Sequence, residues 1–230
     1  MLKHPVRVFG HRGAKGYLAE NTLESIEKAL SFQVDGIEID VHVCATGELV
    51  VFHDFTLDRM TNGVGEVGKH SLEELKKLRV NGGFQIPTLE DVLKRINKEC
   101  IINIELKGKN TASRTSEIVE AYIRNHGWTY KDFIISSFQQ VELEKTFQIN
   151  KNIPLAVLTK ASVAEAITFA KTIKSKIIHP NFALLSTDNV KFAQSQGYQI
   201  NAWTVNDADT ISRMKTYGVD GIISDVPDKI

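Results

Sequence analysis

The stretch DGIEIDVHVCATGELVVFHD, residues 35–54, decides the fold. Its first nine residues form an apolar-rich run typical of a strand, and the run LVVF at 49–52 follows after a short turn around Thr46 and Gly47. A link this short allows only an antiparallel pair, because parallel strands need a long crossover. We therefore expect residues 49–52 to fold back beside 35–43 as a hairpin.

Similar apolar runs recur along the whole chain, and stretches of helical periodicity separate most of them. The nine runs are 6–10, 35–43, 49–52, 101–106, 133–138, 153–158, 176–180, 198–205 and 219–225. Alternating strands and helices predict βα units around a parallel sheet. With 49–52 assigned to the hairpin, eight strands remain, which predicts an α/β fold, a TIM-type (β/α)8 barrel.

Glycines and asparagine punctuate the segment of about 55–87, which indicates a small inserted lobe after the His53–Asp54 element. The chain has 230 residues, of which 42% are hydrophobic, enough to bury one large core. We therefore expect a single domain over residues 1–230.

Capping signals predict where three helices begin. Asn21 with Glu24, and Ser71 with Glu74, have the spacing of capping boxes, and Thr88 precedes a third amphipathic stretch.

Charge and composition bear on the partners. Twenty-eight basic residues balance twenty-eight acidic ones, which argues against nucleic acid or an anionic membrane as the main partner. No apolar run has the length of a signal peptide or a membrane span. The two isolated cysteines, Cys44 and Cys100, favour a reducing compartment, so a soluble, cytoplasmic protein is expected. The oligomeric state is not predicted.

Several predicted strands end in polar residues that an ordinary core would exclude. In α/β barrels, reactive groups lie at the carboxyl ends of the strands, so these side chains should converge on one mouth. They are His11, Arg12, Glu38, Asp40, His53, Glu105 and Lys107.

The acidic members of this set predict a metal site. Glu38 and Asp40 alternate on one strand, so both side chains point into the barrel, where two like charges repel. A cation must lie between them, and a salt bridge to Arg12 or Lys107 would be the structural alternative. With Glu105 on the next strand, three carboxylates make an oxygen-rich site typical of Ca²⁺ or Mg²⁺.

His11 and His53 should face the same cavity, where imidazoles can serve as general acid and base. The residues leave open which histidine does which. We interpret the remaining histidines as structural or surface groups, although strict alternation places His42 on the face of Glu38 and Asp40. They are His4, His42, His70, His126 and His179.

Arg12 and Lys107 supply positive charge suited to a phosphate anion, with ion pairing to the acidic cluster as the alternative. Phe138 and Trp203 end later strands and could wall a substrate pocket or simply fill core.

Taken together, these motifs resemble the glycerophosphodiester phosphodiesterases, and they cover nearly the whole chain in the family's order. The motifs are His11-Arg12-Gly13, Glu20-Asn21-Thr22, Asp35 to Val41, His53-Asp54, Arg59 with Thr61-Asn62-Gly63, Pro87-Thr88-Leu89, Glu105-Leu106-Lys107, Ser136-Ser137-Phe138, Asn201 to Asn206 and Gly221 to Asp225.

The resemblance implies a barrel with an inserted lobe, and it implies the same roles for the polar strand ends: a divalent metal on the three carboxylates, acid/base chemistry at His11 and His53, and phosphate contacts from Arg12 and Lys107. It further implies metal-dependent hydrolysis of a glycerophosphodiester to glycerol 3-phosphate and an alcohol. We expect a cyclic phosphate intermediate, because the substrate's neighbouring hydroxyl gains from proximity. The helix after the eighth strand should be short or missing.

Three other readings stay open. A lysophospholipase D-type enzyme would need an apolar approach surface, which the lobe could provide; a non-catalytic barrel could bind phosphodiesters; and a metal-dependent aldolase or isomerase would rest on fold analogy alone.

Overall fold

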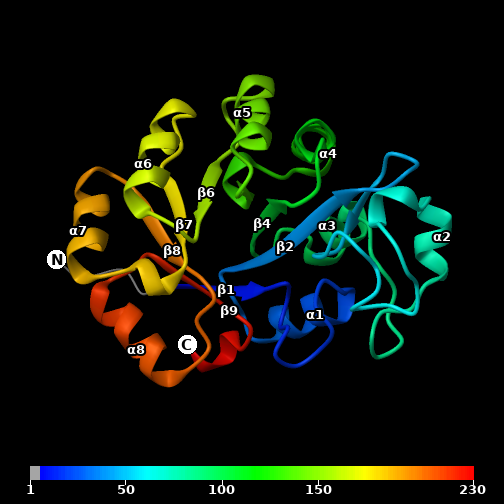
Figure 1. Cartoon of the computed structure of the whole chain (residues 1–230), viewed down its shortest axis with the longest axis horizontal. Helices are drawn as coiled ribbons and strands as arrows, with labels where there is room; N and C mark the ends of the chain where they lie inside the picture. Colours follow the sequence, from blue (N-terminus) through cyan, green and yellow to red (C-terminus); the bar gives the residue numbers. More distant parts are fainter. Residues whose placement is uncertain (1–5) are drawn as a thin grey trace.

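Eight parallel strands close into a barrel in the computed structural model, which describes residues 6–230 (Figure 1). The sheet order runs β1-β9-β8-β7-β6-β5-β4-β2, and pairing of β1 with β2 closes it. The predicted TIM-type barrel is therefore confirmed. Its strands are β1 Arg7–His11, β2 Gly36–Val43, β4 Ile101–Leu106, β5 Phe133–Ser137, β6 Leu155–Thr159, β7 Ile177–Pro180, β8 Gln199–Ala202 and β9 Gly221–Ser224.

The remaining strand, β3 (Leu49–Val51), pairs antiparallel with β2, as the short turn predicts. The pairing continues one step further, because the backbone N–H of Phe52 donates to the carbonyl oxygen of Asp40 at 3.0 Å. The hairpin thereby brings His53 to the end of the barrel where the acidic residues of β2 lie.

Helices surround the strands (Figure 1), and apolar side chains of both fill the layer between them. After β9 the described chain forms one short 3-10 turn, η4, as expected. The helices are α1 Leu23–Ser31, α3 Leu89–Ile96, α4 Thr111–His126, α5 Gln140–Ile149, α6 Val163–Thr172, α7 Thr187–Ser195 and α8 Ala208–Tyr217, with short turns η2 Tyr130–Asp132, η3 Phe182–Leu184 and η4 Pro227–Lys229.

The first helix start differs from the prediction. Its N-cap is Thr22, whose hydroxyl accepts from the backbone N–H of Ser25, so the expected Asn21–Glu24 box is wrong by one residue. Asn21 instead adopts a left-handed conformation, with φ of 59°, and its side-chain amide donates to Asp40 at 2.9 Å. Asn21 is therefore not free to cap the helix, because its side chain donates a hydrogen bond to the buried carboxylate of Asp40. The capping box at Ser71 and the N-cap at Thr88 are confirmed.

The lobe after His53 is built on η1 (Val67–Lys69) and α2 (Leu72–Lys77), as expected. It packs around a small apolar core that it shares with the β2–β3 hairpin, and Leu72, Leu78 and Phe84 lie against that core. That core consists of Cys44, Val50, Phe52, Leu57, Met60, Val67, Leu75, Val80 and Ile86. Most of the lobe's apolar side chains are thus used within the lobe. Within residues 6–230, no helix has the length and apolarity to cross a bilayer.

Below the polar strand ends, an apolar cluster fills part of the barrel interior, beside the buried pair His179 and Asn201. Phe9, Ile134, Ala156 and Ile223 form a buried cluster there. Gly36 pairs with Phe9 across β1 and β2, and a Cβ at Gly36 would lie 2.3 Å from the Phe9 ring. The close approach of ring to backbone explains why β2 begins with glycine.

We expect Gly36→Ala to lower the free energy of unfolding by about 1–3 kcal/mol, the usual scale for overpacking a filled core. Gly68→Ala is the matched control, because a Cβ there meets only an ordinary contact of 3.5 Å. Urea denaturation measures both. If the clash is the cause, Phe9→Leu should reduce the penalty of Gly36→Ala in a double-mutant cycle, and additive effects would contradict it.

Candidate active site

Three carboxylates meet at the carboxyl ends of β2 and β4. Asp40 lies directly opposite Glu105 in the parallel register, and Glu38 precedes Asp40 by one full pleat. One oxygen from each of Glu38, Asp40 and Glu105 lies within 4.8 Å of the others, and all three residues are buried. The structure thus brings the predicted metal ligands together, in an arrangement that could hold a cation.

The protonation of this cluster reflects its crowding. Burial and the neighbouring carboxylates of Asp40 and Glu105 raise the pKa of Glu38 well above its ordinary value. Burial and the charge of Asp40 likewise raise the pKa of Glu105 to about 7. Burial also opposes ionisation of Asp40, but Arg12 and Lys107 outweigh it and lower that pKa. Crowding thus makes Glu38 and Glu105 hold protons that a bound cation would displace, because a cation binds the ionised carboxylates.

Arg12 and Lys107 lie against this cluster. Arg12 Nε is 3.3 Å from Asp40 and has no hydrogen-bond partner within the described chain, while its backbone N–H donates to Glu38 at 3.0 Å. Lys107 Nζ donates to Glu105 at 2.9 Å and lies 3.6 Å from Asp40. The ion pairing considered as an alternative is therefore present, and the phosphate contacts remain a prediction.

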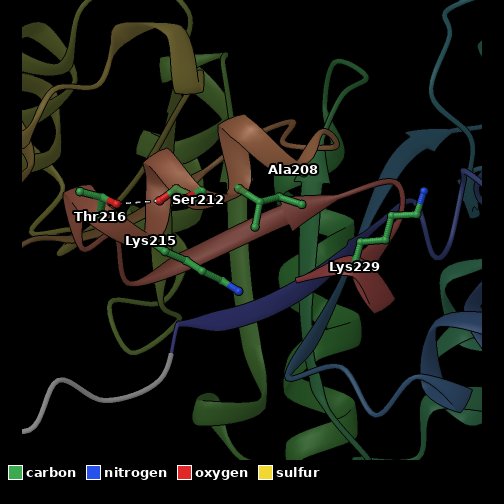
Figure 2. Close-up of a pocket in the computed structure, with 6 residues that line it drawn as sticks. Ala208, Ser212, Lys215, Thr216 and Lys229 are labelled. Atoms are coloured by element: carbon green, nitrogen blue, oxygen red, sulfur yellow. Dashed lines mark hydrogen bonds between the residues drawn. The ribbon is translucent and has the colours of Figure 1, made fainter.

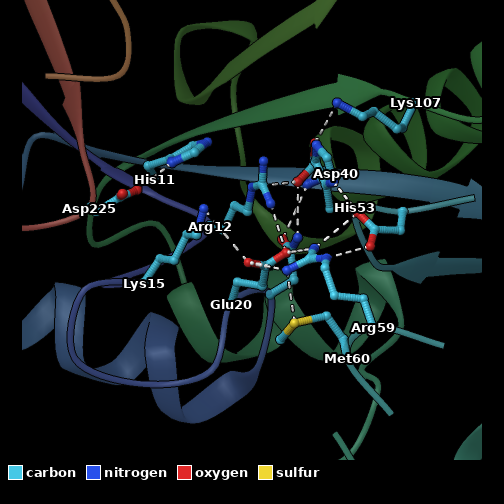
Figure 3. A network of polar contacts seen from close by, with 12 residues as sticks. His11, Arg12, Lys15, Glu20, Asp40, His53, Arg59, Met60, Lys107 and Asp225 are labelled. Carbon is cyan, nitrogen blue, oxygen red and sulfur yellow. Dashed lines mark hydrogen bonds and ion pairs between the residues drawn. The ribbon is translucent and has the colours of Figure 1, made fainter. Parts of the chain in front are cut away.

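Glu20 anchors Arg12, a role that the sequence analysis missed. Its carboxylate accepts from Arg12 at 2.7 Å and from Arg59 at 2.6 Å, and Lys15 lies 3.7 Å away (Figure 3). Burial would raise the pKa of Glu20, but Arg59, Arg12 and Lys15 lower it. Glu20 was part of the Glu20-Asn21-Thr22 motif, and this motif was the only feature of the sequence that drew attention to it. No local sequence pattern predicts its contact with Arg12.

His53 is held by one hydrogen bond at its ring and one at its carbonyl oxygen. Its Nδ1 donates to Asp54 at 2.6 Å, and Arg59 grips the same carboxylate through Nε at 2.5 Å and through its terminal nitrogen at 2.9 Å. His42 Nε2 donates to the carbonyl oxygen of His53 at 3.2 Å. Burial lowers the pKa of His53, although the charge of Asp40 opposes this. His42 thus supports the site without lining its cavity.

His11 lies on the opposite side of the carboxylates and is also bound to an aspartate. Its Nδ1 donates to Asp225 at 2.5 Å, and its Nε2 lies 3.9 Å from Glu38. Asn206 in turn donates to Asp225 at 2.9 Å. Burial lowers the pKa of His11, partly offset by the hydrogen bond to Asp225. Asp225 and Asn206 ended two of the motifs quoted above, but their contact with His11 was not predicted.

These side chains line a cavity of about 100 Å³. Phe138 and Trp203 meet edge to face at its apolar wall, with ring centroids 5.5 Å apart. Asn103 also faces the cavity, and neither atom of its buried amide has a hydrogen-bond partner within residues 6–230. Such orphan groups indicate a space meant for a polar ligand or water. The cavity's polar side comprises His11, Arg12, Glu38, His53, Glu105 and Lys107.

A larger hollow of about 570 Å³ lies elsewhere, between α8 and η4 (Figure 2). Lys215 and Lys229 extend along it beside Ser212 and Thr216, and its lining includes no histidine or carboxylate. It therefore has neither the imidazole pair nor the carboxylate cluster of the smaller cavity. The other histidines in the described part of the chain also lie outside the smaller cavity; His179 is fully buried in the barrel, which lowers its pKa to about 3, and His4 lies outside the described residues.

Comparison with known proteins agrees with this geometry. A profile of the glycerophosphoryl diester phosphodiesterase family matches residues 11–229. A glycerophosphodiester phosphodiesterase of Bacillus subtilis (strain 168) is 33% identical, over 99% of this chain and 86% of its own. One from Caldanaerobacter subterraneus subsp. tengcongensis is 32% identical, over 97% and 95%. An Oleispira antarctica phosphodiesterase, solved with the product sn-glycerol-3-phosphate, superimposes with a TM-score of 0.89 at 28% identity, over 97% and 94%.

Proposed function

Because the chain belongs to the glycerophosphoryl diester phosphodiesterase family, a family of hydrolases, we propose that it cleaves glycerophosphodiesters to glycerol 3-phosphate and an alcohol. One observation carries the proposal: two histidines, each bonded to an aspartate, flank three buried carboxylates in a single cavity. The Oleispira antarctica relative was solved in complex with sn-glycerol-3-phosphate, an anion of the kind that Arg12 and Lys107 in this cavity could contact.

A divalent cation fits the carboxylate cluster. Glu38, Asp40 and Glu105 would hold it, and their oxygen ligands suit Mg²⁺ or Ca²⁺. When bound, the cation would neutralise negative charge on the carboxylates and on the phosphate and make an oxygen nucleophile more acidic.

The cationic side chains would hold the phosphate. Arg12 presents an Nε without a hydrogen-bond partner, and Glu20 fixes the far side of its guanidinium. Lys107 approaches from the other strand end and also lies 5.9 Å from the Phe138 ring. With the carboxylate charge neutralised, Lys107 could turn toward the anion, and Arg12 could bind it through the N–H groups that Glu20 leaves free.

The two histidines would move the protons. Each uses Nδ1 for its aspartate, so each leaves Nε2 for the substrate. One imidazole accepts a proton from the attacking oxygen and the other donates one to the leaving alkoxide. Because His11 and His53 both line the cavity that holds the carboxylates, an in-line displacement at phosphorus would take place between them.

The attacking oxygen is that of the substrate itself. A glycerophosphodiester carries a hydroxyl on the carbon next to the esterified one, and attack by this oxygen on phosphorus forms a five-membered cyclic phosphate as the bond to the alcohol breaks. Water then attacks phosphorus, reopens the ring and gives glycerol 3-phosphate, with the histidines exchanging roles. Proximity favours the first step, with effective molarities on the order of 10⁵ M or more in well-oriented systems.

The neighbouring hydroxyl makes this pathway testable. A substrate analogue with hydrogen in its place should bind with similar affinity and turn over at least about a hundredfold more slowly, because the intramolecular nucleophile is gone. Competition against the ordinary substrate measures binding, and phosphate-ester chromatography measures turnover. Hydrolysis of the analogue at a comparable rate would mean direct attack by water.

A comparison of turnover on different substrates distinguishes the proposed function from the lysophospholipase D alternative. The lobe's apolar side chains mostly pack in the core that it shares with the hairpin, although Val64 is 71% and Phe55 is 58% exposed. We expect glycerophosphocholine and glycerophosphoethanolamine to be better substrates than lysophosphatidylcholine at equal monomer concentration. The reverse order of kcat/KM would favour the lipid enzyme.

A further inference from the structure

Three neighbouring strands end in residues that bond to one another. Asn206 follows β8, Asp225 follows β9, and His11 ends β1, and these strands lie side by side in the barrel. Asn206 Nδ2 donates to Asp225 Oδ2 at 2.9 Å, while Asp225 Oδ1 accepts from His11 Nδ1 at 2.5 Å. The two carboxylate oxygens of Asp225 are therefore divided between the two side chains.

The backbone fixes the direction of this chain of bonds. The amide N–H of Asp225, which can only donate, points at Asn206 Oδ1 at 2.9 Å, and the Ser224 hydroxyl donates to the same oxygen at 3.2 Å. Asn206 cannot turn its amide over without setting its NH2 group against the Asp225 N–H and losing that bond, because a backbone N–H can only donate. The Nδ2 group of Asn206 must therefore face Asp225, and the side chain at position 225 must present an oxygen that accepts this bond.

We propose that Asp225, oriented by Asn206, is a positioning residue that holds the His11 imidazole in the tautomer with hydrogen on Nδ1 and directs Nε2 into the cavity. The inference rests on the proposed function, because it concerns the histidine assigned to proton transfer. Whether His11 acts as acid or base, the proton must pass through Nε2, which faces the carboxylates. A fixed tautomer keeps that nitrogen in the required state.

His53 provides an internal comparison. It also donates from Nδ1 to an aspartate, but Arg59 binds both oxygens of Asp54, so that carboxylate is held by charge. Asp225 is instead held by the neutral side-chain amide of Asn206, so among these bonds its negative charge faces only the His11 ring. Both histidines thus donate from Nδ1 to an aspartate, but an arginine holds one aspartate and an asparagine holds the other.

The fixed direction makes a sharp prediction for Asp225→Asn. Asn206 Nδ2 requires an acceptor, so the new amide must turn its oxygen to Asn206 and its NH2 group to His11. An NH2 group facing Nδ1 forces hydrogen onto Nε2 and inverts the tautomer. The exchanged pair Asn206→Asp with Asp225→Asn reverses this, because a carboxylate at 206 accepts the NH2 group and the amide oxygen again faces His11.

Nitrogen-15 NMR of the imidazoles at pH 8 measures the tautomer, with the His11 signal assigned by its absence in His11→Gln. We expect hydrogen on Nδ1 in the wild type, on Nε2 in Asp225→Asn, and on Nδ1 again in the exchanged pair. In parallel, kcat for glycerophosphocholine should fall about a hundredfold or more in Asp225→Asn with KM within threefold, and recover at least tenfold in the exchanged pair.

Asp228→Asn is the matched control, because Asp228 lies three residues along and its side chain bonds only to the Tyr17 hydroxyl among the described residues. It should leave tautomer and kcat unchanged. An Asp225→Asn protein that keeps hydrogen on Nδ1, or keeps kcat within threefold, would overturn the proposal. The NMR result stands independently of substrate: a wild type that releases no glycerol 3-phosphate contradicts the proposed function, whereas an unchanged tautomer contradicts the role of Asp225.

Discussion

Glu38→Ala, Asp40→Ala and Glu105→Ala are each expected to abolish phosphodiesterase activity while leaving the barrel folded. Removing one carboxylate relieves repulsion within the buried cluster, so stability should not collapse, but the cation loses a ligand. Activity with added Mg²⁺ or Ca²⁺, together with circular dichroism of each variant, measures both effects.

Glu142→Gln is the matched control for these variants. Glu142 is also a buried carboxylate, yet it accepts from the backbone N–H groups of Asn110 and Ala112 at the start of α4, away from the cavity. Its loss should lower stability and leave the response to metal unchanged. Full activity of the wild type in excess EDTA after extensive dialysis would end the metal hypothesis.

Metal binding should also release protons near neutral pH. The pKa of Glu105 is raised to about 7 and that of Glu38 lies well above its ordinary value, whereas a cation binds the ionised forms. Calorimetric titration in two buffers of different ionisation enthalpy counts those protons, without reference to turnover.

His11→Ala and His53→Ala should each reduce kcat by about a hundredfold or more, the usual effect of losing a positioned general acid or base. His70→Ala is the control, because His70 lies in the lobe and, within residues 6–230, its side chain bonds only to the carbonyl oxygen of Glu66. A loss below tenfold in either variant would remove that histidine from the chemistry.

The leaving group distinguishes the two roles. An aryl alcohol of low pKa departs without protonation, so the variant that lacks the general acid should recover most of its rate on an activated aryl ester. Comparison of rates on the aryl and choline esters therefore assigns His11 and His53. Equal recovery in both variants would contradict a division of labour between them.

Local patterns predicted most of the fold because each rule concerns residues close in sequence. The short turn at Gly47 forced the hairpin, and alternation on β2 placed Glu38 and Asp40 on one face. Where a distant partner decided the outcome, the prediction failed: Asn21 looked like a helix cap, but Asp40 on β2 takes its side chain.

The residues that hold the histidines and Arg12 in place could not be predicted from local sequence patterns, because their partners are distant in sequence. Asp225 meets His11 across 214 positions of sequence, and Glu20 meets Arg59 across 39. Nothing near either acid in the sequence identifies its partner. Only closure of the barrel, which brings β9 beside β1, creates the first contact.

Phosphorus NMR of glycerophosphocholine hydrolysis tests the central claim most directly. With the protein and Mg²⁺ or Ca²⁺, the substrate signal should give way to glycerol 3-phosphate, with choline released and with no reaction after metal removal. An unchanged substrate signal in the presence of either metal, or formation of phosphocholine and glycerol by cleavage on the other side of phosphorus, would contradict the account.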